Sequence, residues 1–172
     1  INAHPHFSNS KKLCLVHNGI IENYSTIKQK LIKEGFSFTS ETDTEVLVNL
    51  IEFVKNKNDV KLGEAVQIAL NQVVGAYAIA VIDDDKPDEI VVAKLGSPLC
   101  IGIGEDEHFI GSDVTPFIEY TKDVVYLEDG ELAIIRNHKE TFFRKIDDDS
   151  SISPTVNKLE LSLDKIEKQG FD

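Results

Sequence analysis

The hydrophobic pattern of the chain changes character at Gly75, and this change limits the folds that the sequence can adopt. Between residues 62 and 73, apolar side chains recur at i, i+3, i+4, i+7, i+8 and i+11, which indicates an amphipathic helix. After Gly75 the apolar residues come in short β-rich runs separated by turn residues, a pattern typical of antiparallel strands. Helices first and strands later, in a chain of 172 residues, predict a layered α+β domain rather than a doubly wound parallel sheet.

Two further helices are expected ahead of this one. Apolar residues at helical spacing predict a helix over 23–33. Thr42 and Glu45 stand three residues apart in the pattern of a capping box, so a second helix is expected to begin there. Its apolar stripe ends at the polar stretch 55–59.

The expected strands are short and bounded by turn residues. A strand over 13–16 is expected to lead into a turn at Asn18-Gly19, because Asn-Gly is strong turn chemistry. Residues 114–120 are expected to form a short helix between two later strands. The other expected strands cover 76–82, 89–95, 99–103, 108–111, 124–127, 132–135 and 141–145.

The last part of the chain differs in composition from the rest. Residues 147–155 are polar and contain an Asp triplet and a proline, so we expect an irregular segment or linker. Residues 161–168 are expected to add one or two helical turns. We therefore predict one domain over 1–146 followed by an irregular tail over 147–172.

Charge and hydropathy exclude several classes of partner. The net charge is −12, from 30 acidic and 18 basic residues, and such a field repels nucleic acid and anionic membrane surfaces. No apolar run approaches the roughly 20 residues that span a bilayer. Cys14 and Cys100 are too few for a disulfide framework, so a reducing, cytoplasmic location is expected and both are interpreted as small buried hydrophobes.

Metal and cofactor chemistry have weak support in the sequence. It contains no paired CxxC, HExxH, P-loop or Rossmann glycine motif, so no cofactor is expected. His4, His6 and His17 are close in sequence but lack a nearby thiolate or carboxylate that would favour a zinc site. Structural or supporting roles for these histidines are favoured over metal binding.

Two short segments could carry catalytic chemistry. The Asn18 carboxamide and the Gly19 N–H could converge on one oxygen as an oxyanion hole for acyl transfer, although a simple tight turn is the commoner use of Asn-Gly. Asp43 is expected in the first turn of the second helix, where it could bind an ammonium group. Its alternative role is to complement the helix dipole, which stabilises a helix by about 0.3–1 kcal/mol.

Several segments, taken together in their order and residues, resemble one enzyme family. These segments are NAHPH (2–6), VHNGIIEN (16–23), SETDTEV (40–46), GAYA (75–78), GSPL (96–99), GSD (111–113) and LEDGE (127–131). They are similar to the glutaminase domain of the glutamine:fructose-6-phosphate amidotransferases, and the resemblance covers nearly the whole chain up to about residue 146. Related glutamine amidotransferases share the His-Asn-Gly element, but the residues that flank it usually differ from those in this chain.

The resemblance implies a fold, a reaction and site residues. The fold is the N-terminal nucleophile hydrolase-type four-layer αββα sandwich with antiparallel sheets. In that family an N-terminal cysteine attacks the glutamine carboxamide and its own α-amine acts as the general base. Carried onto this chain, Asn18 and Gly19 are the catalytic oxyanion donors and Asp43 binds the α-ammonium group of glutamine. The resemblance implies neither a cofactor nor a metal.

The family's cysteine nucleophile is not among residues 1–172. Because the chain begins at Ile1 and contains no methionine, we expect a fragment that lacks the N-terminal cysteine strand and is inactive alone. The sugar isomerase domain, which would use fructose 6-phosphate, is expected to follow residue 172, and the intact enzyme is expected to be a homo-oligomer. Two alternatives stay open: a binding module of the same fold that lost its nucleophile naturally, and the glutaminase domain of an amidophosphoribosyltransferase.

Overall fold

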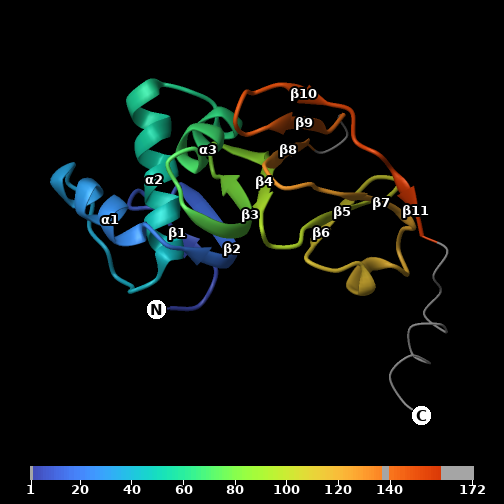
Figure 1. The fold of residues 1–172 in the computed structure, drawn as a ribbon, viewed down its shortest axis with the longest axis horizontal. Coiled ribbons are helices and arrows are strands. Elements are labelled where there is room, and N and C mark those ends of the chain that lie inside the picture. Colours follow the sequence, from blue (N-terminus) through green and yellow to red (C-terminus); the bar gives the residue numbers. More distant parts are fainter. Residues whose placement is uncertain (1, 137–139, 160–172) are drawn as a thin grey trace, which may run out of the picture.

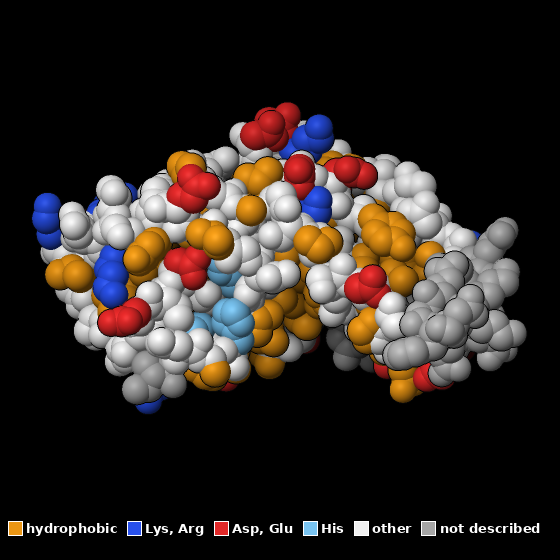
Figure 2. Space-filling model, turned by 60° about the horizontal axis from the view of Figure 1, so that its bottom comes forward, with side chains coloured by type: hydrophobic (Ala, Val, Ile, Leu, Met, Phe, Trp, Pro, Cys, Tyr) orange, Lys and Arg blue, Asp and Glu red, His pale blue; other side chains and the backbone are white. Residues whose placement is uncertain are grey.

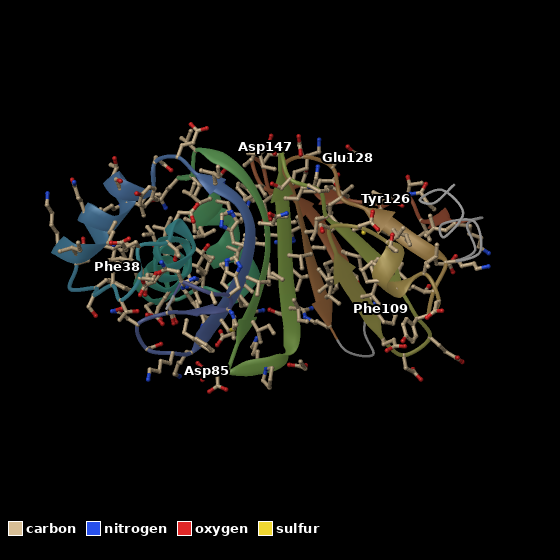
Figure 3. All side chains as sticks on the ribbon, turned by 90° about the horizontal axis from the view of Figure 1, so that it is seen from below. Phe38, Asp85, Phe109, Tyr126, Glu128 and Asp147 are labelled. Atoms are coloured by element: carbon tan, nitrogen blue, oxygen red, sulfur yellow. The ribbon has the colours of Figure 1, made fainter. Side chains whose placement is uncertain are left out.

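Over residues 2–136 and 140–159, which the computed structural model describes, two antiparallel sheets pack face to face and helices cover the outer face of the larger one (Figure 1). Seen from below, the helical layer, the larger sheet and the smaller sheet follow one another (Figure 3). In this described part, the outer face of the smaller sheet carries the 3₁₀ turn η1 (Thr115–Phe117) with its connections, and Leu159 packs against the same cluster. The predicted α+β layering is therefore present.

In the described part of the chain, the larger sheet has seven strands in the order β1-β2-β3-β4-β8-β9-β10 and the smaller has four in the order β11-β7-β5-β6. All neighbouring strands pair antiparallel. The larger sheet contains β1 (His6–Phe7), β2 (Leu13–Ile21), β3 (Gly75–Asp83), β4 (Lys86–Leu95), β8 (Glu131–Arg136), β9 (Phe142–Lys145) and β10 (Ser151–Ile152). The smaller contains β5 (Cys100–Ile103), β6 (His108–Gly111), β7 (Asp123–Tyr126) and β11 (Asn157–Lys158).

The three helices lie where the apolar periodicity predicts them, but some of their first and last residues differ from the predicted ones. They are α1 (Tyr24–Lys33), α2 (Asp43–Asn58) and α3 (Leu62–Leu70). At the start of α2 the Thr42 side chain accepts a hydrogen bond from the Glu45 N–H at 3.2 Å, as a capping box requires. The Glu45 carboxylate, however, accepts hydrogen bonds from Thr39 and Ser40 instead of returning to Thr42. This arrangement ties the loop before α2 to the helix.

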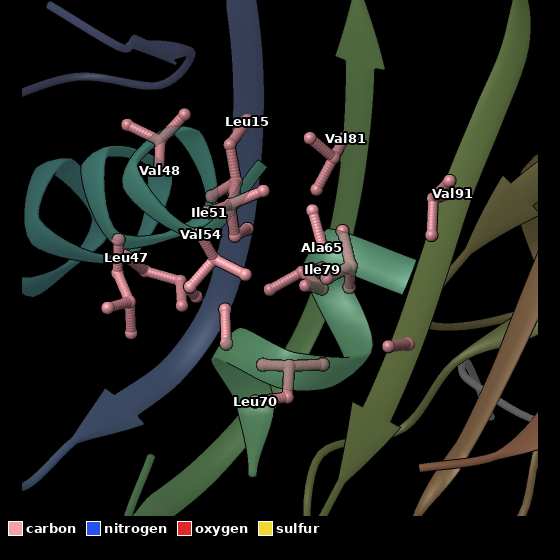
Figure 4. Packing of buried hydrophobic residues seen from close by; sticks show 14 of the residues in the cluster. Leu15, Leu47, Val48, Ile51, Val54, Ala65, Leu70, Ile79, Val81 and Val91 are labelled. Carbon is pink, nitrogen blue, oxygen red and sulfur yellow. The ribbon is translucent and has the colours of Figure 1, made fainter. Parts of the chain in front are cut away.

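Apolar side chains of the middle strands alternate between two cores, which explains their continuous hydrophobic runs. Ile79 and Val81 of β3 face the helices, whereas Ala78 faces the smaller sheet. On the helical side, Leu15 of β2 and Ile51 of α2 belong to the same buried cluster (Figure 4). The burial of both faces fixes the register of β3, because a shift by one residue would exchange the two cores.

Several sequence predictions differ from the structure. The predicted turn at Asn18-Gly19 is wrong, because β2 continues through both residues to Ile21. The short helix expected over 114–120 is reduced to the turn η1. The described part of the predicted irregular tail contains β10 and β11, one on an edge of each sheet, and the helical turns expected over 161–168 lie outside the described residues. Among the described helices, none has the length and apolar character that a bilayer crossing requires.

Candidate functional site

A pocket of about 530 Å³ opens at the uncovered part of β2, beside the start of α2. Its lining comprises Asn2, His4, His17, Asn18, Gly19, Ile20, Ile21, Tyr24, Glu41, Thr42, Asp43 and Thr44. The three residues expected from the sequence, Asn18, Gly19 and Asp43, therefore line one pocket. On the face shown in Figure 2, histidine side chains gather at one place beside an apolar region.

The strand register determines where the Gly19 N–H points. The Glu22 N–H donates to the Val74 carbonyl at 2.8 Å, and hydrogen-bonded pairs alternate along an antiparallel ladder. The N–H groups of Gly19 and Ile21 therefore point away from β3, toward the edge of β2 that β1 leaves uncovered. The Ile21 N–H indeed donates to Asp43 Oδ2 at 2.8 Å. The Gly19 N–H faces the pocket on this same edge.

Gly19 is required by a close approach of backbone, which explains a glycine inside a strand. Its φ is +141°, and a Cβ placed there would lie 2.1 Å from the Ala76 carbonyl oxygen of β3. The neighbouring Asn18 pairs with Ala78 through its backbone, and its exposed side chain borders both the pocket and a second cavity of about 300 Å³ between the sheets. Asn18 thus lies where two open spaces meet.

Asp43 is the first residue of α2, and its carboxylate reaches back to β2. One oxygen accepts the Ile21 N–H, and the other lies 4.0 Å from His17 Nδ1 and 3.5 Å from the Thr44 hydroxyl. The Asp43 side chain is 23% exposed, so a ligand in the pocket can still reach it. A partly exposed carboxylate between fixed donors is suited to an ammonium group.

The three histidines of the first 17 residues contact hydroxyl groups. His17 Nδ1 and His4 Nε2 lie 3.1 and 3.2 Å from the Thr44 hydroxyl, and His6 Nε2 lies 3.3 Å from the Thr42 hydroxyl. Sequence reasoning proposed supporting roles for these histidines but missed the contact with Thr44. The only hint was position, because His17 precedes Asn18 and Thr44 follows Asp43.

His17 is buried as a neutral imidazole. Its side chain is 2% exposed, and burial lowers its pKa, while the Asp43 carboxylate and a backbone contact with Ala76 oppose this shift and the His4 ring adds to it. Its Nε2 has no hydrogen-bond partner among the described residues. A neutral imidazole has one N–H donor and one acceptor nitrogen. Burying an unprotonated Nε2 without a partner costs less free energy than burying an N–H without one.

Acidification is expected to destabilise the chain through His17. In the unfolded chain a histidine has a pKa of about 6.5, and burial lowers the pKa of His17 in the folded state. As the pH falls below about 6.5, the unfolded chain binds a proton that the folded chain excludes, so stability present at neutral pH is lost. Burial lowers the pKa of His6 too and acts in the same direction.

Urea denaturation at pH 7.5 and 5.5 tests this expectation. The free energy of unfolding of the parent chain should fall between these two values, and it should fall less in the His17→Gln variant, which cannot titrate at this position. An equal fall in both proteins would assign the pH dependence to other groups.

The two cysteines are poor nucleophiles. Burial raises the pKa of the Cys100 thiol to about 11, and its sulfur donates to the Gly111 carbonyl. Burial also raises the pKa of Cys14, which is partly buried within β2 and does not line the pocket. Thiols that stay protonated at neutral pH react slowly.

The family model and two curated relatives that match this chain are all named for glutamine-dependent enzymes. A family model described as a glutamine amidotransferase domain matches residues 2–119. The chain is 56% and 49% identical to the glutamine–fructose-6-phosphate aminotransferases (isomerizing) of Bacteroides thetaiotaomicron and Chlorobaculum tepidum. Each match covers 99% of this chain, which spans 28% of the length of these relatives.

Two solved structures share the fold. A glutamine phosphoribosylpyrophosphate amidotransferase from B. subtilis, complexed with ADP and GMP, aligns with a TM-score of 0.71 and 29% identity over 86% of this chain and 32% of its own. An allosteric regulatory enzyme of purine biosynthesis aligns with a TM-score of 0.70 and 30% identity over the same shares. These likenesses and the two antiparallel sheets confirm the predicted N-terminal nucleophile hydrolase-type fold. The chain belongs to the glutamine amidotransferase domain family.

Proposed function

We propose that the pocket beside β2 binds L-glutamine and that the parent enzyme hydrolyses its carboxamide there to glutamate and ammonia. The observation that carries this proposal is the grouping of the Gly19 N–H, the Asn18 side chain and the Asp43 carboxylate around one pocket. Two amide donors suit the oxygen of a carboxamide under attack, and a carboxylate suits an α-ammonium group. Membership of the glutamine amidotransferase family supports glutamine as the substrate.

The spacing along β2 supports the size of this ligand. The N–H groups of Gly19 and Ile21 are two residues apart on the same edge, which corresponds to roughly 6.8 Å along a strand. The second of these groups holds the Asp43 carboxylate. In extended glutamine the α-nitrogen and the amide oxygen are joined by five bonds of about 1.2–1.5 Å and lie roughly 6 Å apart. One molecule can therefore reach both Asp43 and Gly19.

In the proposed reaction this domain supplies binding and oxyanion stabilisation. The nucleophile is the N-terminal cysteine that the family resemblance implies, which is not among residues 1–172. Its sulfur attacks the carboxamide carbon, its proton passes through the α-amine to the leaving ammonia, and water then hydrolyses the thioester to glutamate. Asn18 and Gly19 stabilise the negative oxygen in both steps.

We further propose that the ammonia serves the conversion of fructose 6-phosphate to glucosamine 6-phosphate in the parent protein. Two relatives named glutamine–fructose-6-phosphate aminotransferase are 56% and 49% identical to this chain, whereas the structurally aligned phosphoribosylpyrophosphate amidotransferase is 29% identical. This difference favours the sugar phosphate over phosphoribosylpyrophosphate as the acceptor. The acceptor site belongs to the larger part of such a protein, outside this domain.

The Asp43→Asn substitution in the full-length parent enzyme tests the ammonium contact. Loss of a charge-assisted hydrogen bond of about 1.5–3 kcal/mol predicts a rise in the KM for glutamine of roughly 10- to 150-fold, with a smaller change in kcat. Steady-state assays of glutamate release measure both constants.

Asp59→Asn is the matched control. Asp59 is exposed at the other end of α2 in a left-handed conformation that asparagine tolerates, so this variant should keep the parent KM. A lowered melting temperature with an unchanged KM in Asp43→Asn would support the helix-dipole role and refute the ammonium contact.

A further inference from the structure

The hydroxyl of Thr44 is the meeting point of a partly buried polar cluster in the wall of the pocket. It lies 3.1 Å from His17 Nδ1, 3.2 Å from His4 Nε2 and 3.5 Å from Asp43 Oδ1. Thr44 is 3% exposed and the His17 side chain 2%, so the contact between these two residues is shielded from water. The cluster joins the segment before β1, the strand β2 and the first turn of α2.

Counting protons gives these contacts a direction. A threonine hydroxyl has one proton to donate and two lone pairs that accept. The Asp43 carboxylate can only accept, so the one assignment that satisfies all three contacts together gives the Thr44 proton to Asp43 Oδ1 and makes both imidazole nitrogens donors to the Thr44 oxygen. This assignment makes His17 the Nδ1–H tautomer and leaves its buried Nε2 unprotonated.

The same assignment fixes Asp43 at both of its oxygens. The Ile21 N–H holds Oδ2 from β2, and the Thr44 hydroxyl holds Oδ1 from α2. A carboxylate held in this way keeps its orientation before a ligand arrives, so binding does not have to order it. The β-branched side chain of threonine adds to this effect, because it restricts rotation about χ1.

We propose that Thr44 is a positioning residue of the glutamine site, whose hydroxyl accepts hydrogen bonds from His4 and His17 and donates to Asp43, thereby orienting the carboxylate for the substrate's ammonium group. The inference rests on the proposed function of the pocket. It assigns Thr44 no contact with the reacting atoms, so its effect should appear in glutamine binding rather than in the chemical step.

Kinetics of Thr44 variants in the full-length parent enzyme test the proposal. Thr44→Val keeps the shape of the side chain but removes the hydroxyl, and it should raise the KM for glutamine about tenfold with kcat within about twofold. Thr44→Ser keeps the hydroxyl and should stay within about threefold of the parent KM. An unchanged KM in Thr44→Val, or equal defects in both variants, would overturn the proposal.

Nitrogen-15 NMR of the histidine rings in the unsubstituted chain gives a second test that needs no variant to fold. His17 should be the neutral Nδ1–H tautomer, and an Nε2–H tautomer would overturn the assigned hydrogen bonds. The two proposals can fail separately. An unchanged KM in Asp43→Asn refutes the glutamine contact, whereas a raised KM in Asp43→Asn with an unchanged KM in Thr44→Val refutes only the positioning role.

Discussion

Replacement of Asn18 by alanine in the full-length parent enzyme is expected to lower the kcat for glutamine hydrolysis about 100-fold or more, with the KM for glutamine within a few-fold of the parent. One donor of an oxyanion hole contributes about 2.7–4 kcal/mol to transition-state stabilisation. The Asn18 carboxamide borders the pocket next to the Gly19 N–H, and it has no hydrogen bond to another described residue. It is thus available to a developing oxyanion, and its loss should affect the transition state more than the bound substrate.

The fold should survive this substitution. Asn18 is exposed, and it joins β3 through its backbone, so alanine leaves the strand ladder in place. Thermal unfolding of the variant checks this expectation. Asn58→Ala, at the exposed end of α2, is the matched control and should keep the parent activity. A kcat of Asn18→Ala within a few-fold of the parent would refute the oxyanion role.

Much of the fold could be predicted from the sequence because its signals are local. The helix α3 begins at the predicted residue, and its apolar stripe packs on the larger sheet. The strands β3 and β4 are predicted by continuous apolar runs, since side chains on both of their faces are buried. The two-residue strands β10 and β11 have no such pattern. They exist because β9 and β7 offer free edges to pair with, which is a tertiary effect.

The candidate site is only partly predictable, because its motifs are local but some of its contacts join residues far apart in the sequence. Their motifs predict Asn18, Gly19 and Asp43 as site residues, and the structure brings the three to one pocket. The interpretation of Asn18-Gly19 as a turn was wrong, because a glycine with positive φ serves either a turn or a close approach of strands, and sequence alone does not separate the two. The contacts of Thr44 with His4 and His17 span 40 and 27 residues, so no local pattern reveals them.

Replacement of Gly19 by alanine is expected to lower the free energy of unfolding of the chain by more than about 3 kcal/mol. A Cβ at this position would lie 2.1 Å from the Ala76 carbonyl oxygen and 2.8 Å from its carbon, and the φ of +141° is strained for any L side chain. Both contacted atoms belong to the backbone of β3, so relief requires the β2–β3 pairing to shift. Such a shift would displace the pocket edge that carries the Gly19 N–H. In a chain of 172 residues the loss corresponds to a fall in melting temperature of roughly 6–12 °C or more.

Gly130→Ala separates the steric overlap from the backbone strain. Gly130 also has a positive φ, of +78°, but a Cβ there would meet nothing within 4 Å. This variant should therefore lose only the cost of a left-handed alanine, about 1–2 kcal/mol. Calorimetry or urea denaturation of both variants measures the difference between them. Equal losses would show that β3 yields easily to a side chain at position 19, and the close strand approach would then not be the reason for a glycine at this edge of the site.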